Sequence, residues 1–286
     1  RIADDYVDAV ESSAWDGDWY RRAYFDDGSP LGSRTSDECK IDAIAQSWSV
    51  ISGAANPERA SAAMTSLNKY LVNEEERILL LLTPPFDKTT HDPGYIQGYL
   101  PGVRENGAQY THAALWTVLA TALQGNGDRA LELFQMINPI THSDSQEAVD
   151  RYKVEPYVVA ADVYTAKGHR GRGGWTWYTG SASWMYRIGL ESILGFQLRG
   201  TTLLIEPCVP RSWREFTIEY RYGSATYAIA VRNPEGLERG SIELSLEGRK
   251  LEEGIPLTDD GRRHEVTVLM RPPSPSTRTE PAAAQQ

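Results

Sequence analysis

Apolar residues recur at helical spacing from residue 37 to about residue 195, and the pattern breaks where Gly, Pro or Asn punctuates it. In the first stretch, Ile41, Ile44, Ala45, Trp48 and Ile51 fall on one helical face. The spacing predicts helices over residues 37–52, 57–71, 108–123, 128–137, 155–164 and 181–194. Asn56-Pro57 offers a capping amide before a first-turn proline, which supports the start of the second helix.

After residue 200 the pattern changes to alternating apolar and polar positions, which predicts strands over residues 202–206, 216–220, 226–231, 241–246 and 265–269. Turn signals at residues 222–224 and 233–236 have the spacing of hairpins. We therefore expect a small antiparallel β domain over residues 200–270. The tail, residues 271–286, has no apolar periodicity and is predicted to be disordered.

Long loops at residues 83–107 and 165–180 separate the predicted helices and carry many aromatic and polar residues. Long loops in a compact domain are usually functional or disordered, and the Trp and Tyr content favours ordered, functional loops. Helices joined alternately by short and long connections fit a toroid whose long loops gather at one end. The chain is thus predicted to be mainly α, with residues 1–199 helical.

Composition narrows the possible partners. The formal net charge is −10, so no basic stripe is available for nucleic acid and a neutral ligand is expected. Seven of the eight tryptophans precede Arg199, and sugar rings stack on such faces, although buried core tryptophans would give the same count.

The same composition bears on compartment and chain type. Cys39 and Cys208 are the only cysteines and have no partners at metal-ligand spacing. The sequence therefore predicts neither a disulfide framework nor a metal site, and it favours a reducing compartment. No apolar run approaches the ~20 residues that span a bilayer. The chain starts at Arg1 without a signal peptide, which we interpret as a fragment or a processed product.

Three segments combine residues suited to chemistry. Residues 171–187 place a Thr179-Gly180-Ser181 turn before an apolar helix, where backbone N–H groups and the helix dipole suit an anion such as phosphate, or where the turn is ordinary N-capping. Residues 97–112 carry Glu105, which could accept sugar hydroxyls, and His112, which could donate to an anion. The alternatives are a surface Arg104–Glu105 pair and a structural histidine.

The third segment, residues 14–28, interleaves acids with aromatics. Asp16 is a candidate carboxylate for catalysis or sugar binding, whereas residues 26–30 have the composition of a solvated turn.

Together these segments resemble glycoside hydrolase family 94. The resemblance rests on residues 15–24, on Gly102-Val103-Arg104-Glu105-Asn106-Gly107 with His112, on Glu155-Pro156-Tyr157, and on residues 179–184, and it covers roughly residues 5–221. The family includes cellobiose and chitobiose phosphorylases and the C-terminal part of cyclic β-1,2-glucan synthases, and residues 153–164 and 173–181 look similar to the glucan synthase branch.

The resemblance implies an (α/α)6 toroid followed by a β domain, and inverting cleavage of β-glucosidic bonds by inorganic phosphate as co-substrate, with no other cofactor. It implies phosphate-binding roles for His112, Thr179 and Gly180, and acceptor-sugar roles for Tyr99 and Glu105. One general acid is sufficient, because phosphate is already a nucleophile, whereas an inverting hydrolase needs a second carboxylate to activate water.

The chain departs from the family in one respect. The family's general-acid aspartate lies in a Gly-Asp-Trp-Asn-Asp-like motif, which is absent here, so no catalytic residue is expected in this chain and residues 1–199 are interpreted as the C-terminal part of the toroid. The partners implied are a β-glucan or β-linked oligosaccharide and phosphate. The location implied is cytoplasmic, either free or as a cytoplasmic domain of an inner-membrane parent.

Two other functions stay open on the sequence. One is an inverting hydrolase on a similar toroid, in which Asp16 or Glu105 acts as the base towards water. The other is a non-catalytic carbohydrate-binding fragment, which the missing acid and the aromatic loops favour.

Overall fold

The computed structural model describes residues 1–177 and 179–272, which divide into two compact units. Of the described residues, the first unit contains 1–120 and 133–185, and the second contains 121–132 and 186–272. The predicted disordered tail falls almost entirely on residues 273–286, which lie outside the described residues.

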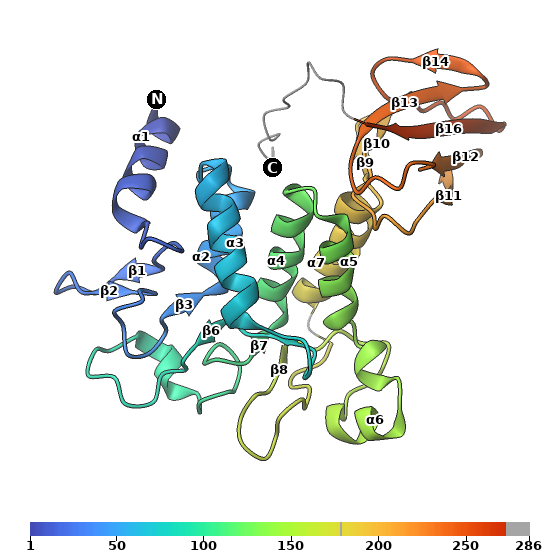
Figure 1. Ribbon diagram of the computed structural model, residues 1–286. Coiled ribbons are helices and arrows are strands. Elements are labelled where there is room, and N and C mark those ends of the chain that lie inside the picture. Colours follow the sequence, from blue (N-terminus) through green and yellow to red (C-terminus); the bar gives the residue numbers. More distant parts are fainter. Residues whose placement is uncertain (178, 273–286) are drawn as a thin grey trace. The chain divides into compact units, whose positions relative to one another are not determined.

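The helices of the chain are α1 (Ile2–Ala9), α2 (Ala43–Ile51), α3 (Pro57–Leu71), α4 (Thr111–Leu123), α5 (Gly127–Met136), α6 (Gln146–Tyr152) and α7 (Thr179–Arg187). Wider π-helical turns follow α1 at Val10–Ala14 and α7 at Ile188–Ile193, and short 3₁₀ turns occur at Gly94–Gly98 and Thr141–Ser143. In the first unit α2, α3 and α4 lie side by side, and the short strands sit at their lower ends in Figure 1.

Four two-stranded ladders, all antiparallel, tie the loops of the first unit together. They pair β1 (Ala23–Tyr24) with β2 (Pro30–Leu31), β3 (Ile41–Asp42) with β6 (Leu82–Thr83), β4 (Val72–Asn73) with β5 (Ile78–Leu79), and β7 (Gln109–Tyr110) with β8 (Asp162–Val163). The core beneath them is formed by fully buried aliphatic side chains, among them Leu67, Leu71, Ile78, Leu79 and Leu115.

Side-chain caps fix where two helices begin. Asn56 accepts a hydrogen bond from the Arg59 backbone N–H at 2.9 Å, as the sequence predicts for α3. Asp42 caps α2 through the N–H groups of Ile44 and Ala45. The helix predicted from residue 37 therefore starts six residues later, because residues 41 and 42 pair with β6 instead.

The helix predicted over residues 155–164 is wrong. Its backbone groups bond to neighbouring segments: Ala161 C=O accepts from Thr111 N–H, and Ala161 N–H donates to Trp175 C=O. The segment ends in strand β8, which pairs with β7. The helical spacing is a coincidence over ten residues, and its β-branched valines fit an extended chain better.

The second unit is built on a five-stranded sheet with the order β11-β12-β16-β13-β14. Its strands are β11 (Glu215–Tyr222), β12 (Ala225–Arg232), β13 (Ser241–Leu246), β14 (Arg249–Leu251) and β16 (Arg263–Arg271). A three-stranded sheet joins β9 (Phe196–Arg199), β10 (Thr202–Ile205) and β15 (Ile255–Pro256). Figure 1 shows these strands in orange and red.

The five-stranded sheet is mixed, which corrects the prediction of a purely antiparallel domain. The turn at residues 222–224 does join a hairpin, because β11 and β12 pair antiparallel over their full length. The turn at residues 233–236 does not, since β16 inserts between β12 and β13 and runs parallel to β12. The apolar pattern of each strand cannot reveal such an insertion, because the insertion depends on which strand edges pair with one another.

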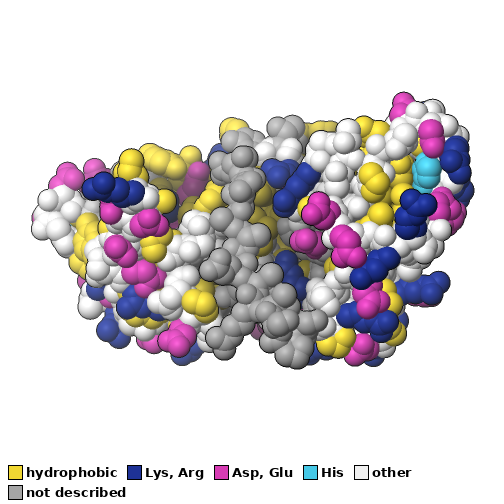
Figure 2. Space-filling view, turned by 90° about the horizontal axis from the view of Figure 1, so that it is seen from above, with side chains coloured by type: hydrophobic (Ala, Val, Ile, Leu, Met, Phe, Trp, Pro, Cys, Tyr) yellow, Lys and Arg dark blue, Asp and Glu magenta, His cyan; other side chains and the backbone are white. Residues whose placement is uncertain are grey.

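The described residues include no helix that is long and apolar enough to cross a bilayer. On the face shown in Figure 2, Lys and Arg side chains are interspersed with Asp and Glu rather than gathered in a basic stripe. Helices and mostly antiparallel ladders are thus observed, while the partial (α/α)6 toroid remains a prediction.

Candidate functional site

Three helices of the first unit begin at one level. Trp48, Trp116 and Trp184 are each the sixth residue of their helix, counted from Ala43 in α2, Thr111 in α4 and Thr179 in α7. The rings of Trp48 and Trp116 meet edge to face at 5.4 Å between centroids, and those of Trp116 and Trp184 at 6.1 Å. Contact at equal depth means that the N-terminal ends of these helices lie together, at the end where the long loops gather (Figure 1).

This juxtaposition brings two predicted phosphate residues side by side. Gly180 is the second residue of α7 and His112 is the second of α4. A Cβ built on Gly180 would stand 3.4 Å from Cε1 of His112, so the imidazole lies directly against the helix start. The Thr179 side chain, the third predicted phosphate group, lies outside the described residues.

The His112 ring packs between two tryptophans, with centroid distances of 4.8 Å to Trp116 and 6.0 Å to Trp184. Burial lowers the pKa of His112 below its usual value, so the neutral imidazole is favoured near pH 7. Trp116 Nε1 is buried and has no hydrogen-bond partner within the described residues. Among the described residues, the site therefore contains a buried N–H donor without an acceptor.

The predicted acceptor-sugar residues share one loop, which a buried amide holds in shape. Asn106 is fully buried, and its Oδ1 accepts from Phe86 N–H at 2.7 Å. Its Nδ2 donates to the carbonyl oxygens of Phe86 and Tyr99, both at 2.8 Å. The Asn106 amide thus ties Phe86 and Tyr99 to the residue that follows Glu105. This holds Tyr99 and Glu105 in the same loop.

Cation–π contacts connect this loop to the second long loop. The Arg104 guanidinium lies 5.6 Å from the Tyr99 ring centroid and 4.5 Å from that of Trp175. Trp175 is 60% exposed, so its ring combines the arginine contact with a face open to solvent. An exposed indole held by a guanidinium is a suitable platform for a sugar ring.

Arg104 and Glu105 do not form a surface pair, which was one of the two interpretations from sequence. Both side chains are only 16% exposed, and Arg104 Nε lies 3.8 Å from Glu105 Oε2. Neither of these two atoms has a hydrogen-bond partner within the described residues. A half-buried pair that contains two buried polar atoms without partners fits a site that a ligand completes better than it fits a solvated ion pair.

Sequence reasoning missed Asp162, because the prediction placed it inside a helix. It is fully buried on β8, and its Oδ1 accepts a hydrogen bond from the backbone N–H of Trp175 at 3.2 Å. Gly173-Gly174 was the available signal: a Cβ on Gly174 would stand 2.2 Å from Asp162 Oδ1, so only glycine allows the backbone to approach. The repeated sixth-residue tryptophan was a second unused signal.

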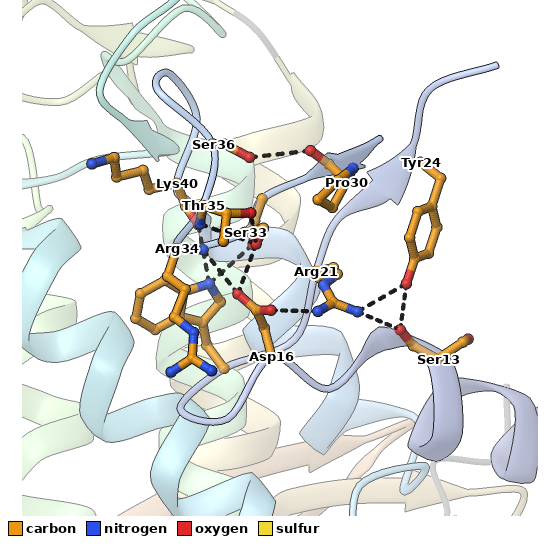
Figure 3. Close-up of polar contacts among 12 residues, drawn as sticks. Ser13, Asp16, Arg21, Tyr24, Pro30, Ser33, Arg34, Thr35, Ser36 and Lys40 are labelled. Atoms are coloured by element: carbon orange, nitrogen blue, oxygen red, sulfur yellow. Dashed lines mark hydrogen bonds and ion pairs between the residues drawn. The ribbon is translucent and has the colours of Figure 1, made fainter. Parts of the chain in front are cut away.

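Asp16 serves the fold rather than a reaction. It is 5% exposed, and its Oδ2 accepts from Ser33 Oγ at 2.9 Å and from Arg34 N–H at 2.8 Å, while Oδ1 accepts from Arg21 at 2.5 Å (Figure 3). Burial alone would raise the pKa of Asp16, but these hydrogen bonds outweigh it and hold the pKa below its usual value. A carboxylate so saturated makes a poor base towards water.

A separate cleft of about 330 Å³ lies between residues 25–38 and 86–91 and contains none of the predicted site residues. Its Glu38 carboxylate already accepts the backbone N–H groups of Asp87, Lys88 and Thr89. His91 stacks on Phe25 and lies 3.1 Å from Asp27 Oδ2. These contacts hold residues 87–91 against residues 25–38.

Among the described residues, no three His, Cys, Asp or Glu side chains lie close enough together to bind a metal ion.

Comparison with known proteins identifies the family. Residues 1–195 match the family described as "Glycosyl hydrolase 94 superfamily, catalytic domain". The match covers more than half of the chain, so the chain belongs to this family, and the resemblance drawn from its motifs is confirmed.

Individual relatives agree with this assignment. A cyclic β-(1,2)-glucan synthase of Rhizobium meliloti is 54% identical over 224 residues, which is 78% of this chain and 8% of that protein. A solabiose phosphorylase of Paenibacillus borealis is 31% identical over 265 residues, 92% of this chain and 34% of that protein. An N,N'-diacetylchitobiose phosphorylase of Vibrio furnissii is 31% identical over 273 residues, 94% of this chain and 33% of that protein. The chain thus spans about a third of these phosphorylases and under a tenth of the synthase.

Proposed function

We propose that this chain forms the phosphate and acceptor-sugar part of an inverting glycoside phosphorylase or glucan-processing transferase. Membership of the family and two phosphorylase relatives support this class. The observation that carries the proposal is the contact between Gly180 and the His112 ring at the converging starts of two helices. Backbone N–H groups and helix dipoles at such ends favour an anion, and the imidazole adds a further donor.

In this proposal phosphate attacks the anomeric carbon of a β-glucoside, while the leaving sugar sits against Tyr99, Glu105 and the open Trp175 face. The general acid that protonates the leaving oxygen comes from outside this chain, as the family resemblance implies. The location we propose is a reducing, cytoplasmic compartment, which is consistent with two free and buried cysteines.

The hydrolase alternative loses one of its two candidate bases. Asp16 is occupied by Arg21, Ser33 and Arg34, as described above, and has no room to bind a water for attack. Glu105 lies next to Arg104 in the acceptor loop, with 3.8 Å between Arg104 Nε and Glu105 Oε2. Product analysis separates the two reactions: glucose 1-phosphate formed only with phosphate supports phosphorolysis, and phosphate-independent release of free glucose excludes it.

The turn at residues 179–181 offers a sharper test in the full-length protein. Thr179→Ala and Gly180→Val are expected to raise the KM for phosphate much more than the KM for the sugar. The first removes a hydroxyl that could bind the anion, and the second places valine methyl groups in the space next to His112. Gly180→Ala is the matched control, since its single Cβ is accommodated at 3.4 Å. His112→Ala should reproduce the phosphate defect without altering the helix start.

A purely capping role makes a different prediction for the same variants. Thr179→Ala would then cost roughly 0.5–2 kcal/mol of stability and leave the phosphate KM of the folded protein unchanged. An unchanged phosphate KM in Thr179→Ala, Gly180→Val and His112→Ala together would refute the phosphate site.

A further inference from the structure

Within the described part of the chain, three buried polar atoms have no hydrogen-bond partner and belong to residues that interact with one another: Arg104 Nε, Glu105 Oε2 and Asp162 Oδ2. The first two lie 3.8 Å apart, and both Arg104 and Glu105 affect the charge state of Asp162. Buried polar groups in native proteins are nearly always paired, so three orphans in one cluster call for an explanation. The cluster contains two carboxyl groups and one guanidinium.

Asp162 occupies the position that joins the two long loops. Its strand β8 pairs with β7, opposite Tyr110, two residues before His112. Its Oδ1 binds the Trp175 N–H, and the Trp175 ring in turn carries the Arg104 guanidinium at 4.5 Å. A change at the Asp162 carboxyl is therefore transmitted to Arg104, the residue next to Glu105.

Charge balance in this cluster favours a proton on Asp162. Burial raises the pKa of Asp162, the backbone N–H of Trp175 and the positive charge and backbone N–H of Arg104 lower it, and the negative charge of Glu105 raises it again, with a net upward shift. The other titratable group facing it is Tyr164, whose own pKa is raised by burial and by Asp162, and which lies near Arg172. Arg104 can balance one carboxylate, and the more deeply buried one is the costlier to ionise.

We propose that Asp162 is a positioning residue that stays protonated in the working protein and so leaves the Arg104 guanidinium to hold Glu105 for the acceptor sugar. This inference rests on the proposed function of Glu105. When Asp162 loses its proton, it competes with Glu105 for Arg104, and the acceptor-sugar site loosens. Sugar affinity then falls as the pH rises, while the phosphate site at His112 and Gly180 is unaffected.

The test compares acceptor kinetics of the full-length protein across pH 5.5–9, with glucose 1-phosphate as donor and glucose as acceptor. In the unsubstituted protein the KM for glucose should rise about tenfold for each pH unit above the pKa of Asp162. Asp162→Asn cannot ionise, so its KM for glucose should stay near the low-pH value throughout. Asp162→Ala, which loses the bond to Trp175, should have a raised KM at every pH.

Asp42→Asn is the matched control, because Asp42 is also a buried carboxyl with a raised pKa but caps α2 instead of facing Arg104. Its KM–pH profile should match that of the unsubstituted protein. An Asp162→Asn protein with the same pH profile as the unsubstituted one would overturn the proposal.

A measurement that needs no activity separates this inference from the proposed function. Carboxyl ¹³C NMR of the 286-residue chain should show Asp162 titrating above the ordinary value of about 3.9. An ordinary titration of Asp162 overturns the inference even if phosphorolysis is established. Free glucose formed without phosphate overturns the phosphorylase assignment and leaves the NMR titration as it is.

Discussion

Two histidines of the first unit are kept neutral by their surroundings. For His112 the cause is burial. For His142 burial and the positive charges of Arg77 and Arg151 lower the pKa to about 4, while Asp144 opposes them. His142 is 7% exposed and stacks on Tyr152 with 4.9 Å between ring centroids. A neutral buried imidazole makes stability depend on pH in a predictable direction.

The His142→Phe variant tests this dependence. The folded-state pKa is lowered from 6.5 to about 4, so the unfolded chain takes up a proton first as the pH falls. The folded state should lose on the order of 3 kcal/mol between pH 6.5 and pH 4 through this residue alone. Phenylalanine keeps the stack on Tyr152 and cannot titrate, so chemical denaturation should show that much less acid destabilisation in the variant. An equal loss of unfolding free energy on acidification in both proteins would contradict this role of His142.

Asp16→Ala should destabilise the first unit strongly. The substitution removes the acceptor of Arg21 Nη2, of Ser33 Oγ and of the Arg34 N–H, and a buried donor left unpaired costs about 1–3 kcal/mol. The measurement is the free energy of unfolding in urea. Asp18→Ala, at an exposed position two residues away, is the control and should change stability by less than about 0.5 kcal/mol. Similar values for the two variants would show that Asp16 is not structural.

At the scale of elements, the acceptor loop depends on a close approach between two backbones. Gly102 has φ +83°, and its carbonyl oxygen accepts the N–H groups of Thr165 and Ala166. A Cβ at this position would stand 2.4 Å from the Ala166 backbone nitrogen. The loop with Glu105 and the loop with Trp175 can therefore join only through glycine.

Gly102→Ala should separate these loops. Backbone strain at a positive φ costs of order 1 kcal/mol before the clash is counted, and the KM for the acceptor sugar should rise at least about tenfold because Tyr99 and Glu105 lose their fixed positions. Gly98→Ala, in the same loop with nothing within 4 Å of the added Cβ, is the control. If both variants bind the sugar equally well, the loop junction does not shape the site.

Elements with local signals could be predicted from the sequence, and those set by distant partners could not. The start of α3 at Asn56-Pro57 and the hairpin at residues 222–224 are encoded by neighbouring residues and were predicted. Strand β8 and the insertion of β16 depend on edges supplied by other segments. The candidate site follows the same division: local motifs singled out Gly180 and His112, which lie against each other, whereas Asp162, buried where two loops meet, was missed.

At the scale of the whole molecule, activity is expected to require more than this chain. The chain covers about a third of the phosphorylase relatives, and in our proposal Glu105 and Asp162 serve the acceptor-sugar site and not the protonation of the leaving oxygen. We predict that the purified 286-residue chain releases no glucose 1-phosphate from β-linked glucose disaccharides, since general acid catalysis contributes about 10²–10⁴-fold. Sustained phosphate-dependent turnover by the chain alone would contradict this, and the full-length protein is the positive control.

The place of β16 in its sheet has a consequence for how the protein is made. This strand lies between β12 and β13, yet it is the last strand of the described chain. While the ribosome is still adding residues before Arg263, the facing edges of β12 and β13 have no neighbour, and such open edges invite pairing with other chains. The five-stranded sheet can therefore close only after the C-terminal strand has been synthesised. Nascent chains that stall before that point present two unpaired edges to chaperones or to one another.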